Sequence, residues 1–172
     1  YTLYNDGRLV IRGTGTTGAI SKVPLTREEK PKVTEIVIEG NVATIGGSAF
    51  DSYANLRTVN LGNVEMIGDY AFSDCTKLES IQTDFVTSIG ENAFWGCTNL
   101  NSVQANSVTS IGYGAFDDCG MISSISLKAL VESEYIPITA SLESLTIGEK
   151  TDAGFVSNLT SASSLKELNI PE

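Results

Sequence analysis

Apolar and polar positions recur through the middle of the chain with a period of 22 residues. The repeated unit reads Ile-Gly-x-x-Ala-Phe-x-x-Cys-x-x-Leu and occurs at 67–78 and 89–100, with Ile for the final Leu at 111–122. A fourth unit at 45–56 has Tyr53 at the Cys position. A fixed period of this length is typical of a solenoid, in which each turn buries its apolar residues only by stacking on the next turn.

A short β-prone run with alternating apolar residues precedes each unit. Alternation with a period of two indicates a strand with one buried face, and equivalent strands of successive rungs must then stack in parallel. The sequence therefore predicts a right-handed, β-rich solenoid with a concave parallel sheet and a less regular convex side. The alternating pairs are Ile36 and Ile38, Val59 and Leu61, Ile81 and Thr83, Val103 and Ala105, Ile125 and Leu127, Leu145 and Ile147, and Leu168 and Ile170.

A second apolar segment follows each strand and is expected to run back across the far face, from Val64, Val86 or Val108 to the next Ile-Gly pair. The glycine of that pair indicates a special backbone geometry or an approach too close for a β-carbon. The small Ala before each Phe leaves room for the ring. We expect the four rings to form one buried, stacked ladder: Phe50, Phe72, Phe94 and Phe116.

The N-terminal region reads as a cap over the first rung. Residues 1–15 predict a β-hairpin, because Asn5-Asp6-Gly7 separates two β-prone runs and is typical turn chemistry. The Gly-rich run at 13–18 predicts a loop, since no apolar-periodic helix follows it to make a phosphate site. Residues 21–32 predict a short helix or loop, and Thr26-Arg27-Glu28-Glu29 has a capping-box pattern.

These boundaries divide one structural domain into a cap at 1–32 and a solenoid at 33–172. Rungs are regular over 33–121, and the first has an extra residue near 39–41 that predicts a bulge. Rungs over 122–172 are irregular. There, Ser133 and Ile138 replace the Ile and Phe of one unit, and Phe155 and Asn158 stand at the Phe and Cys positions of the next.

The composition argues against several classes of function. A net charge of −10 without a basic cluster disfavours nucleic acid as a partner. No apolar run is long enough to insert into a membrane, and no signal peptide is visible at the start. Histidine is absent, which removes the usual general base and the commonest metal ligand. We therefore expect no enzyme activity, no cofactor and no metal site.

The three cysteines, Cys75, Cys97 and Cys119, stand at one position of successive units. In-register stacking would bring neighbouring α-carbons close enough for a disulfide. The favoured interpretation is a column of buried free thiols that pack as small hydrophobic groups, because the spacing is set by the repeat. A disulfide between two of them is the alternative.

Two columns of short polar side chains face away from the predicted core on the concave sheet. The first contains Thr58, Ser80, Ser102, Ser124 and Ser144. The second contains Asn60, Gln82, Gln104, Ser126, Thr146 and Asn169. One interpretation is a solvated face whose hydroxyl and amide ladders support stacking. The other is a hydrogen-bonding floor for a ligand, with Asn60, Gln82, Gln104, Ser126, Ser80 and Ser102 as the candidate residues.

Three aromatic residues are candidates for a second contact surface on the convex side. Trp95 follows Phe94 in its rung, so it should point outward where Phe94 points inward. Tyr70 and Tyr113 occupy the variable positions of their Ile-Gly-x-x-Ala segments. An exposed tryptophan is a natural interface anchor. Partial burial against neighbouring rungs is the alternative.

The repeated unit resembles the BspA-type leucine-rich repeat, also called the Treponema pallidum type. The segment Asp6-Gly7-Arg8-Leu9-Val10-Ile11-Arg12-Gly13-Thr14-Gly15 is similar to one found ahead of the repeats in that family. The resemblance implies a leucine-rich-repeat solenoid on a bacterial surface or secreted outside the cell. It also implies adhesion, with no catalytic residue and no required cofactor.

From the resemblance and the columns together, the expected function is non-enzymatic binding at an extracellular or cell-surface location. The expected partner is a surface or extracellular protein of a host or a neighbouring cell. The alternative is a glycan held on the polar concave sheet.

Overall fold

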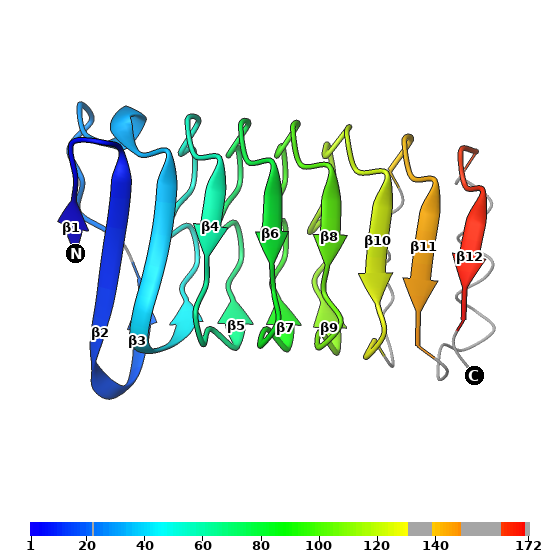
Figure 1. The fold of residues 1–172 in the computed structure, drawn as a ribbon, viewed down its shortest axis with the longest axis horizontal. Coiled ribbons are helices and arrows are strands. Elements are labelled where there is room, and N and C mark those ends of the chain that lie inside the picture. Colours follow the sequence, from blue (N-terminus) through cyan, green and yellow to red (C-terminus); the bar gives the residue numbers. More distant parts are fainter. Residues whose placement is uncertain (22, 131–138, 149–162, 171–172) are drawn as a thin grey trace.

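A computed structural model describes residues 1–21, 23–130, 139–148 and 163–170. Its strands form one 12-stranded sheet that is wound into a solenoid (Figure 1). The sheet order is β12-β11-β10-β8-β6-β4-β3-β5-β7-β9, with β2 beside β3 and β1 beside β2. The predicted β-rich solenoid is therefore confirmed.

The main row of strands corresponds to the predicted concave sheet, and neighbouring strands pair in parallel. Each predicted alternating pair lies in or directly after one of them. The register is that of the repeat, since Ser80 pairs with Ser102 and Gln82 with Gln104. The strands are β3 (Glu35–Ile45), β4 (Thr58–Asn60), β6 (Ser80–Gln82), β8 (Ser102–Gln104), β10 (Ser124–Leu127), β11 (Ser144–Ile147) and β12 (Glu167–Asn169).

A back row of shorter strands forms the predicted return segment. It consists of β5 (Met66–Ile67), β7 (Ser88–Ile89) and β9 (Ser110–Ile111), which also pair in parallel. The long strand β3 belongs to both rows, because its start pairs with β4 and its end with β5. The chain thus encloses a narrow core between two parallel rows.

The N-terminal hairpin is confirmed. Strand β1 (Thr2–Leu3) pairs antiparallel with β2 (Arg8–Ile20), and the Gly7 N–H donates to the Tyr4 carbonyl to close the turn. The loop predicted at 13–18 is wrong, because these residues lie within β2. Strand β2 pairs in parallel with β3 on both sides of this glycine run, with a register shift across it. Pairing to the adjacent rung therefore outweighs the low strand propensity of glycine.

The segment that precedes the first rung contains the predicted capping box. The Thr26 N–H donates to Glu29 Oε2 over 2.9 Å, and the Glu29 N–H donates to Thr26 Oγ1 over 3.2 Å. These reciprocal bonds hold the carboxylate ionised, and they lower the pKa of Glu29. A short 3-10 helix (Lys30–Lys32) follows and leads into β3.

The first rung also has the extra residue expected from the sequence. Glu35 pairs with Thr58, 23 positions further on, whereas Thr44 pairs with Met66, 22 positions further on. The segment from Glu35 to Thr44 therefore contains one residue more than the equivalent segment from Thr58 to Met66 in the next rung.

The core contains the predicted phenylalanine ladder. The rings of Phe50, Phe72, Phe94 and Phe116 are at most 1% exposed. Successive centroids lie 5.3, 5.4 and 5.2 Å apart, and the ring planes differ by 21°, 1° and 8°. Tyr53 extends the file with an edge contact to Phe50 at 5.6 Å. Phenylalanines 22 positions apart in the sequence therefore stack directly on one another in the structure.

The glycine after each isoleucine permits a close approach between rungs. A β-carbon on Gly90 would lie 2.6 Å from the Asp69 nitrogen, well inside van der Waals contact. Of the two explanations for these glycines, the close approach between rungs is therefore the correct one.

The cysteine column is buried and consists of free thiols. Each Sγ donates to the carbonyl of a phenylalanine in the preceding rung: Cys75 to Phe50, Cys97 to Phe72 and Cys119 to Phe94. Burial raises the pKa of Cys75 to about 12. These thiols act as packing groups that also satisfy a buried carbonyl.

The positions predicted to break the repeat, Ser133, Ile138, Phe155 and Asn158, lie outside the described residues. Among the residues that are described, no helix has the length and apolar character needed to cross a lipid bilayer.

Candidate functional site

The two predicted polar columns lie side by side on the outer face of the main row, which we call the polar strand face. Register pairs place like residues next to each other, as in Ser80 with Ser102 and Gln82 with Gln104. The side chains of Asn60, Gln82 and Gln104 are exposed. Ser102 and Ser126 are half-buried between their neighbours. The structure thus brings together all six candidate residues of this sheet.

Two depressions interrupt the polar strand face. One has a volume of about 250 Å³ and the other about 220 Å³. The first lies over β8, β10 and β11, and the second over the start of β3, β4 and β6. The larger is lined by Val103, Gln104, Asn106, Ser124, Ile125, Ser126, Lys128, Ser144 and Thr146, and the smaller by Glu35, Thr58, Val59, Asn60, Ser80 and Gln82.

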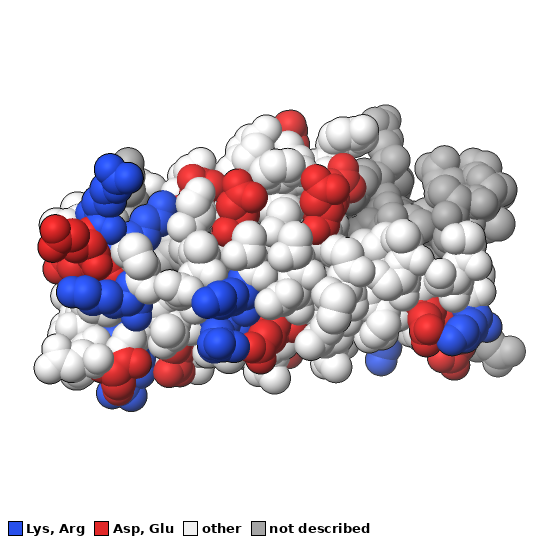
Figure 2. Space-filling view, turned by 90° about the horizontal axis from the view of Figure 1, so that it is seen from above, with Lys and Arg blue, Asp and Glu red and all other residues white. Residues whose placement is uncertain are grey.

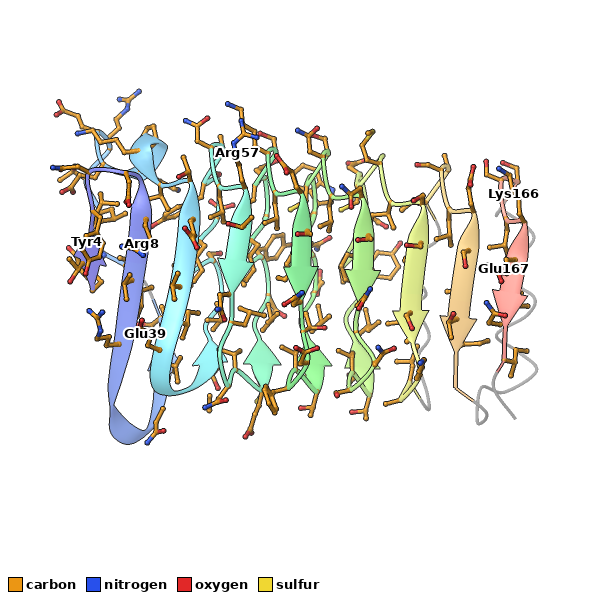
Figure 3. The ribbon with its side chains drawn as sticks, viewed as in Figure 1. Tyr4, Arg8, Glu39, Arg57, Lys166 and Glu167 are labelled. Carbon is orange, nitrogen blue, oxygen red and sulfur yellow. The ribbon has the colours of Figure 1, made fainter. Side chains whose placement is uncertain are left out.

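On the part of this face that the structure describes, a few charged side chains lie beside the hydroxyl and amide groups. Lys128 lines the larger depression and Glu35 lines the smaller one. Figure 3 places Arg8 and Glu39 at the N-terminal end of the row, and Lys166 and Glu167 at the other end. Between these ends the face presents mainly hydroxyl and amide groups, which can both donate and accept hydrogen bonds.

The sequence did not single out Glu35, Asn106 or Lys128. The signal for Glu35 and Lys128 was present, because they lie in or directly after a main-row strand. Asn106 follows β8 by two residues, so strand alternation did not place it on this face. In the structure its Oδ1 accepts a hydrogen bond from Ser126 Oγ over 2.6 Å.

The three convex aromatic residues, Tyr70, Trp95 and Tyr113, are 43%, 38% and 73% exposed. We call them the aromatic face. Asn92 makes a hydrogen bond to each of the three residues, although it was not among the site residues predicted from the sequence. Its Nδ2 donates to the Tyr70 hydroxyl oxygen over 3.0 Å, and its backbone N–H donates to the Tyr113 carbonyl over 3.0 Å. Its own carbonyl accepts from the Trp95 N–H over 3.1 Å.

One position of the convex segment has a left-handed backbone in successive rungs. Tyr70 and Asn92 occupy the same position of successive units, with φ of 56° and 51°. Gly114, at that position in the next rung, has φ of 65°. Asn and Gly tolerate this conformation, whereas a bulky residue such as Tyr is an outlier. The Asn and Gly at one fixed position were the available sequence signal.

The arrangement offers little for catalysis. The chain has no histidine. The three thiols are buried, and burial raises the pKa of Cys75, so it does not ionise near neutral pH. Within 1–21, 23–130, 139–148 and 163–170, no cluster of three or more acidic or cysteine side chains could hold a metal ion.

Comparison with known proteins gives a consistent family. The model of the BspA type leucine rich repeat region matches residues 28–136 in six copies. The T. pallidum leucine rich repeat protein TpLRR aligns with a TM-score of 0.57 and 22% identity, over 94% of this chain and 90% of its own. A comparison with curated proteins gives no match.

Two further solved structures share the fold. A leucine rich cell surface protein from Faecalibacterium prausnitzii aligns with a TM-score of 0.59 and 24% identity, over 97% of this chain and 48% of its own. The pneumococcal vaccine antigen PcpA aligns with a TM-score of 0.54 and 17% identity, over 92% of this chain and 42% of its own. This chain therefore spans about half the length of each, or somewhat less.

Proposed function

This chain belongs to the BspA-type leucine-rich repeat family, and from that premise we propose that it is a non-enzymatic binding module of a cell-surface or secreted protein. Its ligand is an extracellular protein of a host or a neighbouring cell. The ligand lies on the polar strand face, where it makes many hydrogen bonds of modest individual strength.

One observation carries this proposal. The polar strand face combines two depressions with a regular array of hydroxyl and amide groups on consecutive rungs. Parallel pairing fixes the spacing of these groups at about 4.8 Å from rung to rung. A rigid, pre-ordered surface loses little conformational entropy on binding, so even weak contacts can add up to a useful affinity.

The surface location is supported by relatives. One similar structure is described as a leucine rich cell surface protein and another as a vaccine antigen. The absence of histidine and the burial of the thiols support a role without catalysis.

The proposal is tested by binding the purified chain to a panel of purified extracellular matrix and cell-surface proteins. Gln104→Lys places a long charged side chain beside the larger depression. We expect this substitution to weaken binding to any identified protein ligand by at least about tenfold, which corresponds to about 1.4 kcal/mol. Affinity is measured by surface plasmon resonance.

Ser110→Lys is the matched control, because Ser110 is exposed on the back row and not on the polar strand face. It introduces the same side chain and should leave binding unchanged. Equal weakening by both substitutions, or by neither, would contradict a ligand on the polar strand face.

The second candidate is a glycan, and the hydroxyl and amide groups among the lining residues of the two depressions favour it. A glycan array would then give selective signals that Gln82→Ala and Gln104→Ala abolish. If the array gives no signal and Gln104→Lys weakens binding to a protein ligand, the result supports a protein ligand over a glycan.

A further inference from the structure

We propose that the aromatic face docks a Lys- and Arg-rich segment of a partner protein, independently of the polar strand face. Tyr70, Trp95 and Tyr113 are exposed on three consecutive rungs. Asn92 hydrogen-bonds to all three residues, through its side chain to Tyr70 and through its backbone to Trp95 and Tyr113. These hydrogen bonds link the segments of three consecutive rungs that carry the exposed aromatic residues.

The convex segments that carry this face have charges of one sign. The four convex segments, 45–54, 67–76, 89–98 and 111–120, contain no Lys or Arg. They contain six carboxylates: Asp51, Asp69, Asp74, Glu91, Asp117 and Asp118. In Figure 2, acidic side chains lie along the upper margin of the middle rungs, whereas below them and at both ends basic and acidic side chains lie together.

The ion pairs found in the described ranges lie on other surfaces. Arg12 pairs with Glu39, Arg57 with Glu79, and Lys166 with Glu143. Three of the convex carboxylates, those of Asp51, Asp69 and Glu91, instead accept hydrogen bonds from uncharged groups. Asp69 Oδ1, for example, accepts a hydrogen bond from the Glu91 N–H over 2.8 Å.

Asn92 holds an aromatic ring and a carboxylate together. Its Nδ2 lies 3.0 Å from the Tyr70 hydroxyl oxygen and 3.2 Å from Glu91 Oε1. A phenol ring beside a carboxylate is the arrangement that a guanidinium or ammonium group favours, because the ring face and the anion both attract it. An acidic partner would be repelled by the negative charge of these segments, and an apolar partner would gain nothing from it.

The dimensions suit a short stretch of extended chain. Three consecutive rungs span about 10 Å, and an extended peptide advances about 3.3 Å per residue. Three or four residues would therefore cross the aromatic face. Basic side chains at alternate positions would point to the same side and reach the rings.

The chain provides its own reporter, because Trp95 is the single tryptophan. We would titrate the purified protein with a synthetic peptide that alternates Arg and Ser, and follow the emission of Trp95. A saturable change that weakens with added salt is expected. The same peptide with Glu in place of Arg should give no change.

Two variants distinguish this face from general attraction to an acidic protein. Glu91→Gln removes one charge beside Tyr70 and keeps the oxygen that Asn92 contacts. We expect a loss of affinity of about threefold to fivefold, the upper part of the range for one exposed ion pair. Glu65→Gln removes the same charge from an exposed residue outside the four segments, and it should change affinity by less than about 1.5-fold.

An unchanged Trp95 emission at peptide saturation, or equal losses in Glu91→Gln and Glu65→Gln, would overturn the inference. A loss caused by Gln104→Lys would place the peptide on the polar strand face, which supports the proposed function and refutes this one. Tyr113→Ala, followed with a labelled peptide, should weaken binding without affecting thermal stability.

Discussion

The side-chain amide of Asn92 donates to the hydroxyl oxygen of Tyr70 one rung away, over 3.0 Å. Both residues have a left-handed backbone, with φ of 51° and 56°. The bond joins two turns that are 22 residues apart in the chain and orders an otherwise exposed ring. The convex side is thus held by specific side-chain contacts as well as by the backbone.

Substitutions at Asn92 should separate these two contributions. Asn92→Gly keeps access to positive φ and loses the bond to Tyr70. Asn92→Ala loses both, because a β-carbon disfavours the left-handed conformation. We expect Ala to be less stable than Gly by about 1 kcal/mol in urea unfolding. Equal stabilities would mean that the backbone conformation at this position costs nothing.

The phenylalanine ladder should dominate the stability of the regular rungs. Phe94→Ala removes a fully buried ring that stacks on both sides, and it should cost about 3–5 kcal/mol. Phe85→Ala is the same substitution at a ring that is 58% exposed, and it should cost less than about 0.5 kcal/mol. Chemical denaturation measures both, and similar losses would show that Phe94 is not stacked in the core.

The close approach at the Ile-Gly pair predicts a sharp difference between two glycines. Gly90→Ala would place a β-carbon 2.6 Å from the Asp69 backbone nitrogen, so neighbouring rungs must separate. We expect a loss of about 1–3 kcal/mol. Gly120→Ala meets no atom within 4 Å and should be nearly neutral. Thermal melting of the two variants checks the comparison.

Stability should fall at alkaline pH. Burial raises the pKa of Cys75 from 9.0 to about 12 and that of Tyr53 from 10.0 to about 12. As pH rises above 9.0, the unfolded chain releases the Cys75 proton while the folded chain retains it, so the free energy of unfolding decreases. Cys75 alone contributes a slope of at most about 1.4 kcal/mol per pH unit.

Urea unfolding at several pH values measures this slope. Cys75→Ala should flatten it between pH 9.0 and about 12, while leaving the pH dependence below 9.0 unchanged. An unchanged slope in the variant would mean that other groups control the alkaline transition.

Much of the fold could be predicted because one apolar pattern repeats. The 22-residue period determined the parallel register, the phenylalanine ladder and the cysteine column. The loop predicted at 13–18 was wrong because local propensity was the only guide there, whereas pairing with β3 depends on a segment more than 20 residues away. A glycine-rich segment therefore carries no local sequence pattern that would reveal such long-range pairing.

The candidate surfaces were only partly visible in the sequence. The polar columns followed from strand alternation, so their placement was predictable. Asn92 was not, because its role depends on a Tyr70 hydroxyl one rung away and on a left-handed turn. The depressions were not predicted either, because their shape depends on how side chains of neighbouring rungs are oriented, which a pattern of residue types does not specify.

The central claim is that residues 22 positions apart lie directly beside each other. Ser80→Cys combined with Ser102→Cys tests it, because these residues pair across β6 and β8. Neighbouring strands are about 4.8 Å apart, a separation that a disulfide spans. Ser80→Cys with Ser124→Cys places the thiols two strands apart, about 9.6 Å, which is too far.

The measurement is the yield of intramolecular disulfide after mild oxidation of each folded variant, determined by mass spectrometry after digestion. We predict efficient cross-linking of residues 80 and 102, and none of residues 80 and 124. Cross-linking of the second pair, or of neither, would contradict the stacked register on which the fold and both proposed surfaces depend.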